Sequence, residues 1–141
     1  MDFVSIRIIT GDVARLVAFY ERATGVRAQW ATEDFAELET ATATLAIAST
    51  RTVALFAPDS AAPGANRSVI TEFLVADVDR VHRELSGTEI VAEPTTMPWG
   101  NRSLLVRDPD GNLVNFFTPV TAAAITKFAA RDRIGAITQD R

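Results

Sequence analysis

The chain has 141 residues and a net charge of −4, and it contains no Cys and only one His, His82. These counts exclude zinc fingers, iron–sulfur clusters, disulfide scaffolds and metal sites that need several His from one chain. The acidic balance argues against nucleic acid as a partner, and no apolar run approaches the roughly 18 residues that cross a bilayer. Because the N-terminus enters a strand-like pattern without a signal peptide, we expect a cytoplasmic protein, and the excess of Arg over Lys indicates a bacterial coding style.

The first half of the chain predicts one strand, one helix and three more strands. Residues 3–9 are rich in β-branched side chains and predict a strand. Asp12 is placed to cap a helix that ends near Gly25. The apolar stripe of this helix consists of Val13, Leu16, Val17 and Tyr20. The three strands that follow are predicted at 26–31, 34–40 and 43–49.

The second half predicts the same order of elements. Residues 57–67 hold two Pro and one Gly and predict a linker. A strand at 68–76 precedes a helix that begins after Asp77 and ends at Gly87. The last three strands are predicted at 88–94, 101–107 and 112–118. After residue 120, a short helix capped by Thr121 leads into a polar tail.

The two halves also share a short sequence pattern. Residues 11–16 (GDVARL) match residues 76–81 (ADVDRV) at an offset of 65, with three of six positions identical. This match and the shared order of elements predict an internal duplication of a βαβββ unit, and therefore an α+β fold. We expect one domain at 1–120, with repeat one at about 3–56, the linker at about 57–67 and repeat two at about 68–120. A C-terminal helix and tail would occupy 121–141.

Several motifs in this order resemble the vicinal oxygen chelate superfamily, which contains glyoxalases, bleomycin resistance proteins and dioxygenases. The matching segments are 8–13 (IITGDV), 73–79 (FLVADVD), 97–103 (MPWGNRS) and 107–113 (RDPDGNL), together with Phe19, Tyr20 and Gly25. The resemblance implies two βαβββ modules whose sheets form an open, barrel-like cup with the helices outside. It also implies a homodimer with a small molecule in the cup. Metal-dependent members hold one divalent ion with four side chains, mostly His and Glu, from the first and last strands of each half.

The resemblance places those four metal-binding positions at Ser5, Thr71, Asn115 and within the segment 45–48 (LAIA). None of these positions holds a His or a carboxylate, and neutral oxygens alone bind transition metals poorly. A register slip of one residue would bring Glu72 into the cup. His82 is expected on the outer surface of a helix. We therefore predict no metal and no other cofactor, with metal-dependent chemistry disfavoured.

Strand alternation then predicts which residues line the cup. If Ser5 faces inward, so does Arg7, and the same rule links Thr71 to Phe73 and Asn115 to Phe117. Two Trp residues near strand ends would form a rim, and Arg102 would pair with an anionic group of the ligand. The predicted ligand-binding residues are Ser5, Arg7, Trp30, Thr71, Phe73, Trp99, Arg102, Asn115 and Phe117. The alternatives are that the Phe residues fill core and that Arg7 pairs with Glu72.

The predicted function is metal-free binding of a small, aromatic or partly polar organic molecule, of the sequestration or resistance type, by a homodimer. No catalytic residue is assigned. One alternative is an enzyme: a glyoxalase, lyase or dioxygenase whose ligands lie elsewhere, or a metal-free isomerase that uses Glu72 and Arg7. A second alternative is a non-catalytic interaction protein whose cup is filled by side chains.

Overall fold

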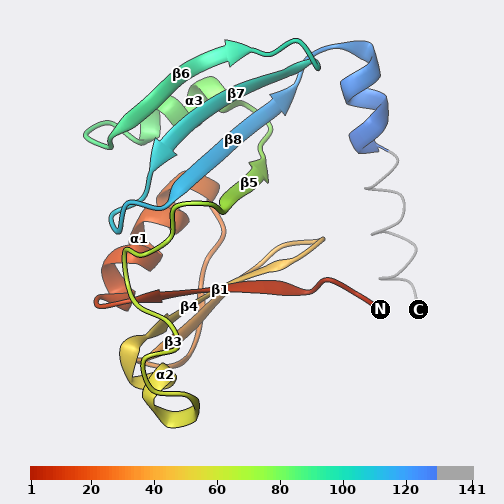
Figure 1. The fold of residues 1–141 in the computed structure, drawn as a ribbon. Coiled ribbons are helices and arrows are strands. Elements are labelled where there is room, and N and C mark those ends of the chain that lie inside the picture. Colours follow the sequence, from red (N-terminus) through yellow and green to blue (C-terminus); the bar gives the residue numbers. More distant parts are fainter. Residues whose placement is uncertain (130–141) are drawn as a thin grey trace.

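The computed structural model describes residues 1–129, which form two tandem βαβββ units and a final helix (Figure 1). The first unit consists of β1 (Ser5–Thr10), α1 (Val13–Thr24), β2 (Gln29–Thr32), β3 (Phe35–Glu39) and β4 (Thr44–Ser49). A short helix that the sequence pattern did not indicate, α2 (Thr50–Phe56), follows directly. The second unit consists of β5 (Ile70–Leu74), α3 (Val78–Glu84), β6 (Ile90–Thr96), β7 (Asn101–Arg107) and β8 (Leu113–Pro119). The final helix covers 122–129. The predicted tail beyond it, 130–141, lies outside the described residues.

Each unit forms its own four-stranded mixed sheet. The first sheet has the order β1-β4-β3-β2 and the second has the order β5-β8-β7-β6. In both, the first and last strands of the unit pair in parallel, and the remaining neighbours are antiparallel. The predicted duplication is therefore confirmed. Over residues 1–129 no strand of one sheet pairs with the other, so the sheets do not close into a barrel.

Helices α1 and α3 begin where the sequence predicts. The carboxylate of Asp12 accepts a hydrogen bond from the backbone N–H of Arg15, and Asp77 caps α3 in the same way. Gly25 ends α1 in the left-handed conformation, with φ of 73°, which suits a residue without Cβ. No helix of the described residues is long and apolar enough to cross a membrane.

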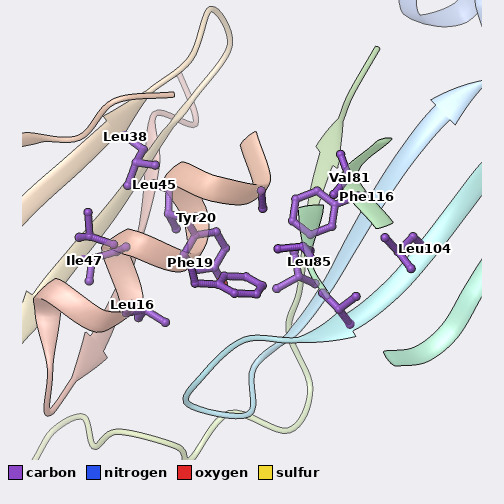
Figure 2. Packing of buried hydrophobic residues seen from close by; sticks show 14 of the residues in the cluster. Leu16, Phe19, Tyr20, Leu38, Leu45, Ile47, Val81, Leu85, Leu104 and Phe116 are labelled. Atoms are coloured by element: carbon purple, nitrogen blue, oxygen red, sulfur yellow. The ribbon is translucent and has the colours of Figure 1, made fainter. Parts of the chain in front are cut away.

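The hydrophobic core is one cluster that contains residues from both units. Figure 2 shows Leu38, Leu45 and Ile47 of the first sheet on one side of α1, and Leu104 and Phe116 of the second sheet on the other. Helix α1 contacts β3, β4 and α3. Helix α1 lies between the two sheets, so the sheets of one chain do not enclose the expected cup with both helices outside it. Its wide apolar surface explains this position: six of its twelve residues are buried, against two of seven in α3.

Tyr20 of α1 joins the two units most directly. Its ring lies 5.9 Å from that of Phe73, which stacks on Phe116 at 5.5 Å. The Tyr20 hydroxyl donates a hydrogen bond of 2.7 Å to Oδ2 of Asp108, in the turn before β8. Burial, reinforced by the negative charge of Asp108, raises the pKa of the Tyr20 hydroxyl far above its usual value. Tyr20 therefore remains a neutral donor. Its buried hydroxyl, which lies in the first unit, is hydrogen-bonded to a carboxylate of the second unit.

Candidate functional site

Each sheet packs one face against α1 or α3. The opposite face is contacted only in part, by α2 in the first sheet and by the final helix in the second. The core side of the first sheet carries Ile6 and Ile8, so alternation sends the intervening side chains to the opposite face. We call this surface the first open face, and it contains Ser5, Arg7, Ile9, Glu37, Ala46 and Ala48. The corresponding surface of the second sheet is the second open face, and it contains Ile70, Glu72, Leu74, Ser103, Leu105, Leu113, Asn115 and Phe117.

The structure divides the predicted ligand-binding residues between several places. Those that lie on an open face are Ser5, Arg7, Asn115 and Phe117. Trp99 lies in the loop between β6 and β7 and is 65% exposed. The remaining residues lie on the helix side of a sheet, which corrects the expectation that they share a face with the others.

Thr71 and Phe73 point to the core rather than to the second open face. Their neighbours across the ladder are Val114 and Phe116, which are fully buried. The partner of Asn115 is instead Glu72. The prediction that Thr71 and Phe73 face the ligand was thus wrong by one residue along β5, and Glu72 occupies the open face instead. This strand has apolar side chains on both faces, so hydrophobicity alone does not set its orientation.

Arg102 and Trp30 are also on the helix side. Arg102 pairs with Thr118 in the ladder and forms a two-pronged ion pair with Asp79 of α3, with a shortest distance of 2.9 Å. It therefore ties β7 to its covering helix. Trp30 pairs with Ala36, a core residue, just before an irregularity in the β2–β3 ladder.

Glu72 is the principal residue that the predicted set lacks. Its Oε2 accepts a hydrogen bond of 2.7 Å from Nδ2 of Asn115 on the neighbouring strand. The other polar atom of the amide, Oδ1 of Asn115, is buried and has no hydrogen-bond partner within residues 1–129. The repeat contained a signal for Glu72, because the offset of 65 that aligns the helix caps also aligns Glu72 with Arg7. The second open face thus presents the exposed carboxylate of Glu72, which the Asn115 amide group holds by one hydrogen bond.

Arg7 lies in a groove on the first open face. The groove has a volume of about 520 Å³ and runs between β1 and the segment that begins with α2. Arg7 and Ile9 line one wall, and Val53 and Phe56 of α2 line another. This volume is within the range of about 300–1,000 Å³ that small-molecule sites occupy. Because α2 was not predicted, the groove could not be derived from the strand pattern alone.

The final helix covers one end of the second open face. The ring of Phe128 lies 5.2 Å from that of Phe117, which is only 7% exposed. The helix starts against Gly100, whose carbonyl accepts hydrogen bonds from the backbone N–H groups of Val120 and Thr121. A Cβ at Gly100 would collide with the Thr121 hydroxyl. The chain itself therefore covers Phe117, and Glu72 and Asn115 form the polar part of the second open face.

The donor set of the open faces does not fit a divalent metal ion. At the centre of each parallel strand pair, the open faces present Arg7 beside Ala46 and Glu72 beside Asn115. A guanidinium repels a cation and a methyl group donates nothing. Glu37, which pairs with Ala46, lies on a different face from Glu72 and Asn115, so these groups leave an ion underligated. Within residues 1–129 there is no group of three or more His, Asp or Glu that could hold an ion. His82 lies on α3, away from both faces.

Comparisons with known proteins agree with this architecture. The sequence profile of the Glyoxalase/Bleomycin resistance protein/Dioxygenase superfamily matches residues 2–116. A glyoxalase/bleomycin resistance protein/dioxygenase family enzyme from Burkholderia phytofirmans PsJN is similar with a TM-score of 0.74 and 17% identity, over 85% of this chain and 100% of that one. A glyoxalase/bleomycin resistance protein/dioxygenase from Nocardioides is similar with a TM-score of 0.67 and 20% identity, over 86% of this chain and 85% of that one. TioX from Micromonospora sp. ML1 is similar with a TM-score of 0.63 and 23% identity, over 85% of this chain and 100% of that one. A search of curated proteins gives no match.

Proposed function

Because the chain belongs to the glyoxalase/bleomycin resistance protein/dioxygenase superfamily, we propose that it binds a small organic molecule, without a metal ion, between the open faces of two copies of itself. The ligand would be a flat, aromatic or partly polar molecule that the protein sequesters. The observation that carries this proposal is the pair formed by Glu72 and Asn115 on an otherwise apolar strand surface.

The Glu72–Asn115 pair has a physical reason to bind a hydrogen-bond donor. Glu72 is exposed, and Asn115 donates a hydrogen bond to only one of its carboxylate oxygens, Oε2. A ligand N–H or O–H group would bond to the other carboxylate oxygen, and a hydrogen bond to a charged group contributes about 1.5–3 kcal/mol. The flanking Ile70 and Leu74 are about half exposed and offer apolar contact to the rest of the ligand. A few polar groups within an apolar surface are the usual composition of a small-molecule site.

The position of α1 supports a second copy as the other wall of the site. Since α1 lies between the sheets, the two open faces of one chain do not line a common cavity. The faces carry opposite charges at equivalent positions, Arg7 on the first and Glu72 on the second. Large apolar side chains at the strand ends, Phe3 and Ile70 among them, are exposed. The first open face of one chain is therefore complementary to the second open face of another, and we propose a homodimer with two such sites.

A ligand screen with a matched charge control tests the proposal. Thermal unfolding is followed with a panel of flat aromatic compounds that carry hydrogen-bond donors, and sedimentation gives the oligomeric state. A ligand at 100 times its Kd stabilises the native state by about 2.7 kcal/mol. We expect Glu72→Gln to weaken binding at least tenfold, and Glu93→Gln, an exposed carboxylate on β6, to leave it unchanged.

Three outcomes would contradict parts of this proposal. A stoichiometric divalent ion in protein purified without chelator would overturn the metal-free site. A monomer at micromolar concentration would overturn the shared site. Conversion of a bound compound to a product, lost in Glu72→Gln, would replace sequestration by a metal-free isomerase-type reaction in which the Glu72 carboxylate moves a proton.

A further inference from the structure

A second groove lies between α1 and two turns of the second unit, at 87–89 and 107–109. It has a volume of about 510 Å³, and its lining includes three arginines, Arg15 and Arg22 of α1 and Arg107 at the end of β7. Arg107 pairs with Leu113 at the end of the β7–β8 ladder, and the groove shares no lining residue with the one beside α2. We propose that it is a separate binding site for a small molecule that carries two or more neighbouring anionic groups, phosphate or carboxylate.

The two helical arginines are spaced to hold such groups from one side. Arg15 and Arg22 are seven residues apart, which places them on one face of α1 with roughly 10 Å between their levels along the axis. Both residues are exposed. In the described part of the chain, neither side chain takes part in an ion pair or a hydrogen bond. Their guanidinium groups therefore remain available to a ligand.

Arg107 supplies the opposite wall and is held in place. One of its terminal nitrogens donates a hydrogen bond of 3.0 Å to the carbonyl of Gly111, and its side chain is 32% exposed. The remaining guanidinium N–H groups are free of side-chain hydrogen bonds within residues 1–129. Arginine forks bind phosphate and carboxylate in a two-pronged manner. Thr88, which also lines the groove, adds a hydroxyl donor.

The acidic residues of the groove do not neutralise it. The Asp108 carboxylate is buried and points inward, where it accepts hydrogen bonds from Tyr20, Asn112 and the backbone of Asp110. Glu89 lies 3.9 Å from Nε of Arg107 and is 71% exposed, so this contact is loose and solvated. The groove is thus a positively charged site on a protein whose net charge is −4. The positive charge of the groove, which is opposite to the net charge of the chain, would attract an anionic ligand.

The test uses titration calorimetry at low salt with inorganic pyrophosphate, citrate and, as a single-anion reference, inorganic phosphate. We expect pyrophosphate or citrate to bind more tightly than phosphate, and the stronger of the two identifies phosphate or carboxylate as the preferred group. The double variant Arg15→Gln/Arg22→Gln should weaken binding at least tenfold. Glu89→Gln should strengthen it, because the competing carboxylate is gone. The double variant Arg80→Gln/Arg83→Gln removes the same two charges from exposed positions of α3 and should change binding less than twofold.

Two results would overturn the proposal. The first is the absence of binding heat for pyrophosphate and citrate at millimolar concentration. The second is an equal loss of affinity in the α3 double variant and in the α1 double variant, which would mean attraction by overall charge only. The variant Arg107→Lys keeps the charge but removes the fork, so we expect an intermediate loss with unchanged thermal unfolding of the free protein. The screen at the open faces uses different residues, so either proposal can fail alone.

Discussion

The two halves of the molecule share a scaffold and differ in the chemistry of their open faces. Both pair their first and last strands in parallel, and both begin their helix at a capping Asp. At equivalent positions, however, β1 presents Arg7 and β5 presents Glu72. The residues that form the core are apolar in both halves, whereas Arg7 and Glu72, on the opposite faces of their sheets, carry opposite charges. The difference shows that strand alternation lets one side of a sheet hold the fold while the other side takes on new chemistry.

The helices differ as much as the faces do. Helix α1 has twelve residues and lies between the sheets. Helix α3 has seven and contacts β6, β7 and β8 of its own sheet as well as α1. The first half therefore supplies most of the shared core. The predictions below ask whether the two halves act as one cooperative unit and which contacts make them so.

The largest effect is expected at the shared core. Phe116→Ala removes a fully buried ring that stacks on Phe73 and should lower the free energy of unfolding by about 3–5 kcal/mol. The two Trp residues, one in each half, allow the unfolding of each half to be followed separately by fluorescence. Urea unfolding is followed by fluorescence of Trp30 in a Trp99→Phe background and of Trp99 in a Trp30→Phe background. Both signals should shift together.

The matched control for this prediction is Leu55→Ala, since Leu55 is 88% exposed. It should change stability by less than about 0.5 kcal/mol. Separate transitions at the two Trp residues would contradict the shared core, because they would mean that the halves unfold independently.

A middle-sized effect is expected at the polar contact between the halves. Tyr20→Phe keeps the ring against Phe73 but removes the hydroxyl that bonds to the buried Asp108. We expect a loss of about 1–3 kcal/mol, because a hydrogen bond to a charged group is lost and an acceptor stays buried. The measurement is again urea unfolding. A loss below about 0.5 kcal/mol would show that the apolar contacts alone join the halves.

The smallest effect is expected at an ion pair that exists only in the second half. Asp79 pairs with Arg102, and the equivalent of Asp79 in the first half is Ala14. The hydrogen bond from Arg102 lowers the pKa of Asp79. The pair therefore stabilises the fold above the ordinary Asp pKa of about 4, and this stabilisation is lost as the pH falls through the lowered pKa. Both side chains are partly exposed, so the effect is small and weakens with salt.

Thermal unfolding of the protein and of Asp79→Asn at pH 7 and pH 3 checks this sign. The variant should be slightly less stable at pH 7, and the difference should shrink at pH 3. A difference that stays the same at both pH values would assign the effect to helix capping or packing rather than to the charge.

Much of the fold could be predicted from local patterns, and the site only in part. Capping residues and β-branched runs located the duplicated units, because these signals act over a few residues. The orientation of β5 was missed because Ile70, Phe73 and Leu74 place apolar groups on both of its faces. Arg102 was assigned to a ligand because its partner, Asp79, is distant in sequence. The location of α1 between the sheets depends on packing between whole units, which no local pattern encodes.

The core that surrounds α1 also changes the role of the segment that joins the units. Residues 57–69 contain no helix or strand and join the end of α2 to β5. The contacts of Tyr20 with Phe73 and Asp108 hold the units together without them. The segment is therefore a tether. It keeps two complementary fragments at a high effective concentration, and their association is encoded in the buried surfaces rather than in the covalent connection.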